Sequence, residues 1–181
     1  MSSLSLEQNK QTKTTYMSNE NNQPLSINLS LGAIQTAIPR IADGAQPLFR
    51  LTDVNQASVE GKPDNLKFTF ELVNPAQSTE GTPIMPGSPG SKHIEFVPTQ
   101  SKPDAKDPNW HLKKLSNIVD SLLGTADAGH KSKPTRPDFN VETVGMMLGK
   151  EVYLTMKAKT GEYADRGNEV SRFTHPGDLK A

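Results

Sequence analysis

Leu66-Lys67-Phe68-Thr69-Phe70-Glu71-Leu72 and Val152-Tyr153-Leu154-Thr155-Met156-Lys157 are two stretches in which apolar and polar residues alternate strictly. Because successive side chains of a β-strand point to opposite faces of the sheet, each stretch predicts a strand with one buried and one exposed face. The outward set of the second strand combines an aromatic ring, Tyr153, with cations at Lys157 and Lys159. A single nucleic-acid strand can use a surface of this chemistry.

The composition limits the class of protein. A chain of 181 residues has room for one domain with a core and for additional tails, and 14 prolines with 13 glycines predict long loops or disordered arms. The absence of cysteine excludes disulfides, thiolate metal sites and cysteine nucleophiles. We find no apolar run approaching the roughly 20 residues of a membrane helix and no signal-peptide layout, so we expect a soluble intracellular protein with no membrane partner.

The net charge is zero, with 20 basic and 20 acidic residues. Such a chain has no global basic field that would gather nucleic acid from a distance. Any nucleic-acid site must therefore be local.

The distribution of residue types predicts the order of the elements. Residues 1–23 contain too few apolar groups to offset the entropy of ordering and are predicted to be a disordered arm. We expect one domain over 24–175 and a short tail over 176–181. Strands are predicted at 25–31, 48–59, 66–73, 92–97, 151–158 and 168–174, the second and third of them forming a hairpin. The proline- and glycine-rich segment 74–91 and the basic segment 125–137 are expected to be loops.

Two helices are expected between the strands at 92–97 and 151–158. Asp107 followed by Pro108 predicts the start of the longer helix, which carries Trp110 and is stopped by Gly124. Asp138 is predicted to cap a second, short helix. The phenylalanines that alternate with polar neighbours are expected in the core, namely Phe49, Phe68, Phe70 and Phe96.

This order of elements is that of a small Greek-key barrel with an inserted helix, as in an oligonucleotide/oligosaccharide-binding (OB) fold. The run 41–44, the strands at 48–54 and 66–72, the helix at 110–123 and the segments 149–154 and 168–170 resemble bacteriophage single-stranded-DNA-binding replication and recombination proteins. The resemblance covers roughly residues 25–175. The segments 74–91 and 125–137 look like insertions, and the acidic, aromatic-ended tail of bacterial single-strand-binding proteins is missing.

The resemblance implies a mainly β protein with an OB-like barrel, one prominent helix and long loops. It also implies a protein that coats and protects single-stranded DNA during replication or recombination, in the cytoplasm of the infected bacterial host. Partners are then expected among phage replication or recombination proteins, and a homo-oligomer is left open.

The candidate nucleic-acid surface consists of outward cations and aromatic residues on the predicted strands and in the basic loop. Its members are Arg50, Lys67, Lys131, Lys133, Arg136, Tyr153, Lys157, Lys159, Arg166, Arg172 and Phe173. Bases can stack on the rings, and phosphates can contact Lys and Arg. The alternative for each cation is that it only solubilises the outer face of a sheet.

The remaining motifs do not indicate an enzyme. We find no P-loop, nucleophile elbow or Gly-x-Gly-x-x-Gly run, and the four histidines lack metal-ligand spacing, so neither a cofactor nor a metal is expected. The rival to DNA binding is a phage structural or adaptor protein whose β-domain binds other proteins. The neutral net charge favours the rival, whereas the strand with Tyr153 and the family resemblance favour DNA binding.

Overall fold

The computed structural model describes residues 38–58, 64–101, 104–159 and 167–179. The described residues all belong to one compact unit, Ala37–Ala181. The predicted arm over 1–23, the predicted strand over 25–31 and the candidate residue Arg166 lie outside the described residues.

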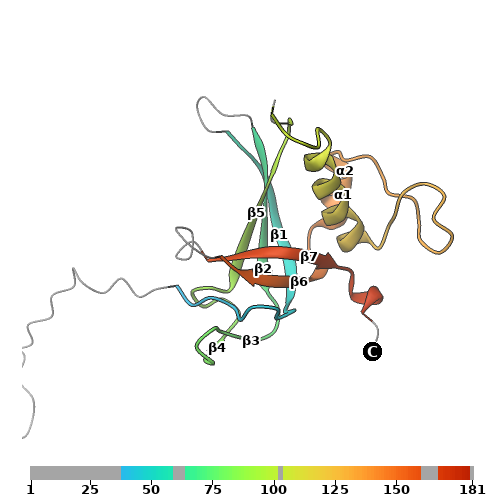
Figure 1. Ribbon diagram of the computed structural model, residues 1–181. Helices are drawn as coiled ribbons and strands as arrows, with labels where there is room; N and C mark the ends of the chain where they lie inside the picture. The colour runs from blue at the N-terminus through green and yellow to red at the C-terminus, as the bar shows by residue number, and fades with distance from the viewer. Residues whose placement is uncertain (1–37, 59–63, 102–103, 160–166, 180–181) are drawn as a thin grey trace, which may run out of the picture. The chain divides into compact units, whose positions relative to one another are not determined.

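Five strands form one antiparallel sheet (Figure 1). They are β1 (Leu48–Ala57), β2 (Asn65–Leu72), β5 (Lys92–Pro98), β6 (Glu151–Ala158) and β7 (Asn168–Thr174). Their order in the sheet is β5-β2-β1-β6-β7. The predicted hairpin is confirmed, because β1 pairs with β2. The mainly β prediction is also confirmed, but the described strands end at β5 on one side and β7 on the other, with no pairing between these two to close a barrel.

The sheet changes direction where β1 meets β6. Only Leu48–Arg50 of β1 pairs with β6, and the chain before β1 continues this pairing through Pro47 and Ala45, whose carbonyls accept hydrogen bonds from the backbone N–H groups of Leu154 and Met156. As a result, β6 and β7 run across the direction of the other three long strands (Figure 1).

Two β-bulges decide which side chains reach each face. In β1 the register passes from Leu51 to Asp53, so Thr52 is the extra residue. In β7 it passes from Arg172 to Val170, so Ser171 is the extra residue. A bulge re-aims the side chains that follow it.

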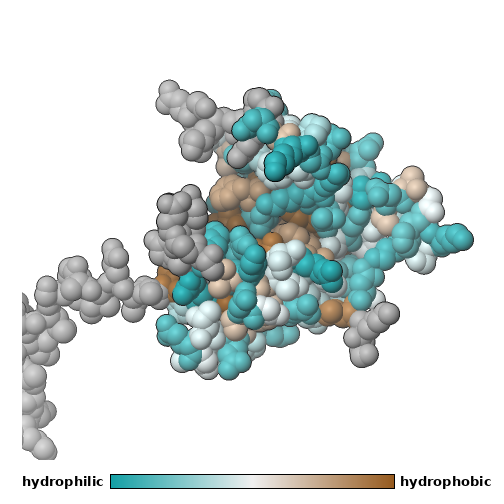
Figure 2. All heavy atoms as spheres, in the orientation of Figure 1, coloured by the Kyte–Doolittle hydropathy of each residue, from teal (hydrophilic) through white to brown (hydrophobic). Residues whose placement is uncertain are grey.

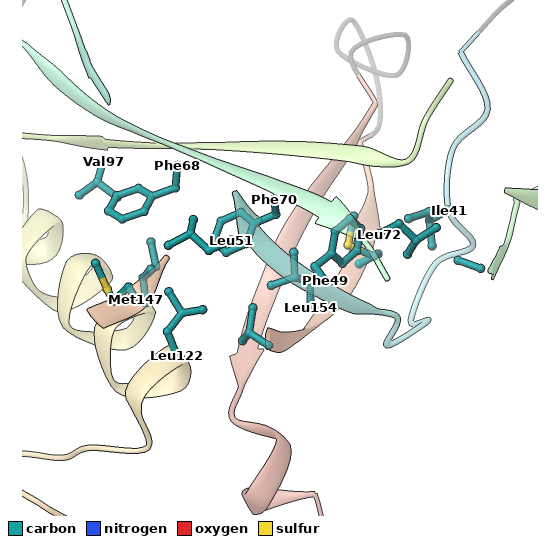
Figure 3. Packing of buried hydrophobic residues seen from close by; sticks show 14 of the residues in the cluster. Ile41, Phe49, Leu51, Phe68, Phe70, Leu72, Val97, Leu122, Met147 and Leu154 are labelled. Atoms are coloured by element: carbon teal, nitrogen blue, oxygen red, sulfur yellow. The ribbon is translucent and has the colours of Figure 1, made fainter. Parts of the chain in front are cut away.

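The core fills the space between the inner face of the sheet and the helices. Phe49, Phe68 and Phe70 are fully buried, which confirms the prediction for these three rings. Figure 3 shows Phe68 and Phe70 beside Leu51, with Leu122 and Met147 at the helical end of the cluster. These helical residues come from α1 (Trp110–Leu123) and α2 (Val141–Met147). Burying one such aromatic side chain stabilises the fold by about 1.5–3 kcal/mol.

The structure corrects both predicted helix caps. α1 begins at Trp110 with Asn109 before it, and the Asp107 carboxylate instead accepts a hydrogen bond from the Asn109 backbone N–H and pairs with Lys113 of the helix. For α2 the cap is Asn140, whose side chain accepts from the Thr143 N–H at 2.9 Å, so Asp138 is not the cap. The end of α1 is as predicted, since Gly124 adopts the left-handed conformation with φ of 68°.

The segment 74–91 is also more regular than predicted. It contains two short paired strands, β3 (Ala76–Gln77) and β4 (Pro83–Ile84). Ile84 is buried in the core, and the Ser78 hydroxyl bonds the Thr82 hydroxyl and accepts from its backbone N–H. Side-chain hydrogen bonds therefore order a turn whose proline and glycine content predicted only a loop.

Candidate nucleic-acid interface

The outward face of the sheet carries a row of side chains across β1, β2 and β5. Asn55 lies opposite Lys67, and Lys67 lies opposite Phe96. Directly opposite residues on one face of an antiparallel pair have Cβ atoms about 4.5–5.5 Å apart. An amide, an ammonium and an aromatic ring are thus cross-strand neighbours.

Phe96 is the main site residue that the sequence did not indicate. The expectation that it packs in the core is wrong, because it is 48% exposed, and Ile94 on the same face is 44% exposed. The register explains the error, since Phe68 is inward and lies opposite Glu95, which turns Phe96 outward. Strand β5 has apolar residues at both parities, because Val97 is buried while Ile94 is not, so alternation alone did not decide the face.

Contacts among Glu95, His93 and Lys114 on the inner side hold β5 in this orientation. Glu95 contacts both the His93 Nε2, at 2.9 Å, and the Lys114 ammonium of α1. Lys114 also donates to the Phe96 carbonyl at 3.0 Å. Burial works against ionisation of Glu95, but the hydrogen bonds from His93 and Lys114 outweigh it and hold the pKa of this carboxyl below its usual value.

The second part of the outward face lies on β6 and β7. Val152, Leu154 and Met156 are buried, so the intervening Tyr153 and Lys157 lie on the other face, as alternation predicted. The bulge at Ser171 places Arg172 opposite Thr155, on the same outward face. Phe173, in contrast, lies opposite Leu154 and packs against Phe70, with ring centroids 6.0 Å apart. It is half-buried on the inner side of the strand and is not part of the outward row.

Several candidate cations are already paired with carboxylates. Arg50 pairs with Glu151 at 2.7 Å, and Lys157 pairs with Glu169 at 3.6 Å. Lys133 of the basic loop pairs with Asp178 in the tail. A bound phosphate would have to compete with these carboxylates, so we expect each paired cation to contribute less to binding than an unpaired one.

Arg136 has a structural role in the basic loop. Its guanidinium forms two hydrogen bonds with Asp120 of α1 and contacts Asp127 at 2.9 Å. These contacts, the hydrogen bonds to Asp120 first among them, raise the pKa of Arg136. The Thr125 hydroxyl donates to the same Asp120 carboxylate. This network fixes the loop to α1 and occupies the guanidinium.

Three candidate cations have no carboxylate partner within the part of the chain that the structure describes: Lys67, Lys131 and Arg172. Lys67 and Arg172 are on the outward sheet face, whereas Lys131 is on the exposed loop. Lys159 follows β6 and already interacts within the protein, so it is not counted among the unpaired cations. The structure thus gathers Lys67, Tyr153 and Arg172 on one sheet face and leaves the basic loop elsewhere.

A groove of about 610 Å³ lies between α1 and β7. Its walls include Trp110, Lys113 and Asn117 from the helix and Arg172 with Phe173 from the strand. On the face seen in Figure 2, apolar residues reach the surface above the place of β7, beside hydrophilic ones. Arg172 lies opposite Thr155 on the outward face and also lines the groove, so it belongs to both.

The described residues contain no group of three or more His, Asp or Glu side chains that could hold a metal ion. No helix among them is both long and apolar enough to cross a membrane. Comparison with protein-family models and with curated proteins found no match to this chain.

Proposed function

We propose that this chain binds single-stranded DNA along the outward face of its sheet and is not an enzyme. The observation that carries the proposal is the row formed by Lys67 and Phe96, in which an exposed ring lies beside a cation without a carboxylate partner among the described residues. Stacking of a base on such a ring contributes about 1–3 kcal/mol and tolerates any base. The neighbouring ammonium can contact the phosphate of the same nucleotide.

We further propose that the sheet is a variant of the OB fold. The strands β1, β2 and β5 follow one another as a meander, α1 comes next, and β6 returns to the side of β1. In OB folds the second and third strands form the binding face for oligonucleotides. The corresponding strands here are β2 and β5, which carry the row described above.

The biological role that we infer comes from the sequence resemblance. The chain would coat and protect single strands during phage DNA replication or recombination, in the cytoplasm of the infected host, together with other phage proteins of that process. Little sequence preference is expected, because the outward row offers stacking and charge rather than a set of paired donors and acceptors aimed at base edges.

A phage structural or adaptor protein is the second candidate. The cations paired on the sheet face favour it, and so does the apolar surface of α2 and the turn after it, where Val141 is 88% exposed, Met146 54% and Leu148 44%. Large apolar side chains left exposed on one short element can contribute to a protein-binding surface.

Fluorescence anisotropy with a labelled oligo-dT at low and moderate salt tests the proposal. We expect saturable binding by the full chain. In Phe96→Ala the free energy of binding should be weaker by about 1–3 kcal/mol, because one base loses its stacking partner. Met146→Ala is the matched control, since it removes a similarly exposed apolar side chain from α2 and should leave the affinity unchanged. If the unmodified chain does not bind at low salt, the adaptor function replaces DNA binding.

A further inference from the structure

The groove between α1 and β7 has an excess of positive charge. Three basic side chains line it, namely Lys113, Lys114 and Arg172, against one acidic side chain, Asp107. Lys113 pairs with Asp107, with its ammonium 2.6 Å from the carboxylate, and Lys114 pairs with Glu95 of β5. Arg172 is exposed and has no carboxylate partner in the described part of the chain, so an anion entering the groove meets an uncompensated guanidinium.

The same groove presents aromatic surface. Trp110 forms part of the helical wall and Phe173 part of the strand wall, and both are half-buried. One side of Phe173 is covered by Phe70 in the core, which fixes the ring against the strand. The rings of Trp110 and His111 lie edge-on with centroids 6.3 Å apart, and Trp110 also lines the groove. Flat apolar rings beside a cation suit a ligand with a planar ring and an attached anion.

The groove also continues the sheet face. Arg172 lies opposite Thr155 on the outward side of β7 and at the same time lines the groove. A strand that crosses the sheet towards β7 therefore reaches the groove at Arg172. A volume of about 610 Å³ is in the usual range for a site that holds a small organic ligand.

We propose that this groove binds one nucleotide of the single strand that crosses the sheet, with the phosphate at Arg172 and the base against Trp110. This inference rests on the proposed function and adds a second, pocket-like subsite at the β7 edge. A strand held both on the open face and in the groove is fixed at one end, so the groove sets where the bound strand starts or stops along the protein.

The chain provides its own reporter for the test. Trp110 is the only tryptophan, so intrinsic tryptophan fluorescence reports on this groove alone. The full chain is titrated with a 15-nucleotide oligo-dT in two ways, with a labelled oligonucleotide by anisotropy and with an unlabelled one by tryptophan fluorescence. We expect the tryptophan signal to be quenched over the same concentration range in which the anisotropy rises.

Two charge variants on α1 separate the groove from a general effect. Asn117→Glu places a carboxylate in the groove wall at an exposed position, so the fold is retained. Leu112→Glu is the matched control, because Leu112 is also exposed on α1 but does not line the groove. We expect Asn117→Glu to suppress the quenching and to weaken binding by about 5-fold or more, the lower end of the loss for one stacked base, while the control changes neither.

The outcomes separate the two proposals. If labelled oligo-dT binds but tryptophan fluorescence stays constant, or if both variants behave alike, the groove proposal is wrong and DNA binding by the sheet face stands. If the anisotropy shows no binding at low salt, both proposals fail together. Quenching by hexaglutamate but not by oligo-dT would assign the groove to an acidic peptide and overturn the nucleotide site.

Discussion

Replacing Phe70 by alanine tests the assignment of the two sheet faces. Phe70 is fully buried, lies opposite Leu51 and has Phe173 and His93 as ring neighbours at 6.0 and 6.4 Å. The truncation removes a ring from the centre of the cluster and leaves a cavity. Because β2 is paired with β1 on one side and β5 on the other, we do not expect the backbone to move and fill it. We expect a loss of about 3–5 kcal/mol in the free energy of unfolding, the usual range for an aromatic residue in a core.

The matched substitution is Phe96→Ala. Phe96 is on the neighbouring strand β5, and its side chain lies on the opposite, outward face of the sheet. Phe96 is 48% exposed, so its truncation removes only part of a buried ring and creates no internal cavity. We expect it to cost about 1 kcal/mol, roughly half of the transfer free energy of a fully buried side chain. Urea unfolding followed by circular dichroism gives both values, with unchanged m-values as the sign that the compared states are the same. Equal losses in the two variants would refute the assignment of Phe96 to the outward face.

Three further results follow from the same geometry. Tyr153→Ala should weaken oligo-dT binding by about 1–3 kcal/mol with little change in salt dependence, as measured by anisotropy, whereas an unchanged affinity would remove β6 from the binding face. Lys67→Ala should reduce the slope of log affinity against log salt by about 0.7, the value for one phosphate contact on a single strand, and Lys157→Ala should reduce it less because Glu169 already pairs with that cation. The pKa of Glu95 in the folded protein is lowered from 4.5, so the stabilisation from its ionised form is complete above that pH and is lost as the pH falls through the folded pKa. The difference in free energy of unfolding between the unmodified chain and Glu95→Gln, measured with urea, should therefore decrease from pH 7 to pH 3. A constant difference would contradict the ion-pair account.

The strands could be predicted from sequence where one parity is wholly apolar. In β6 the residues Val152, Leu154 and Met156 share one face, so periodicity alone gave both the bounds and the buried side. The buried side of β5 could not be predicted in the same way, because its inner positions include the polar residues His93 and Glu95. These residues contact each other, and Glu95 also contacts a lysine from α1. The contact of Glu95 with the α1 lysine joins residues distant in the chain, and no local pattern indicates it.

The site could be predicted only in part, for a related reason. A sequence identifies a cation but not the carboxylate that the fold places beside it. Arg136 illustrates this, since the basic loop suggested phosphate binding while Asp120, from the preceding helix, takes up its guanidinium. Arg172 shows the converse, because a bulge of one residue at Ser171 brings it onto the outward face. Bulges follow from strand pairing, which the alternation in each separate strand does not determine.

The pairing of charges also shapes how the proposed binding would work. With zero net charge, the chain has no long-range field that would attract a polyanion. On the sheet face, Arg50 and Lys157 are already paired with Glu151 and Glu169. What remains for a strand is stacking on Phe96 and Tyr153, whose strength does not depend on salt, and a small number of unpaired cations, whose contribution does. Such a face would hold a strand weakly per nucleotide and release it readily. A second anchoring point at the β7 edge, where Arg172 is shared by the face and the groove, would then raise the affinity of the whole strand by joining two modest contacts in one ligand.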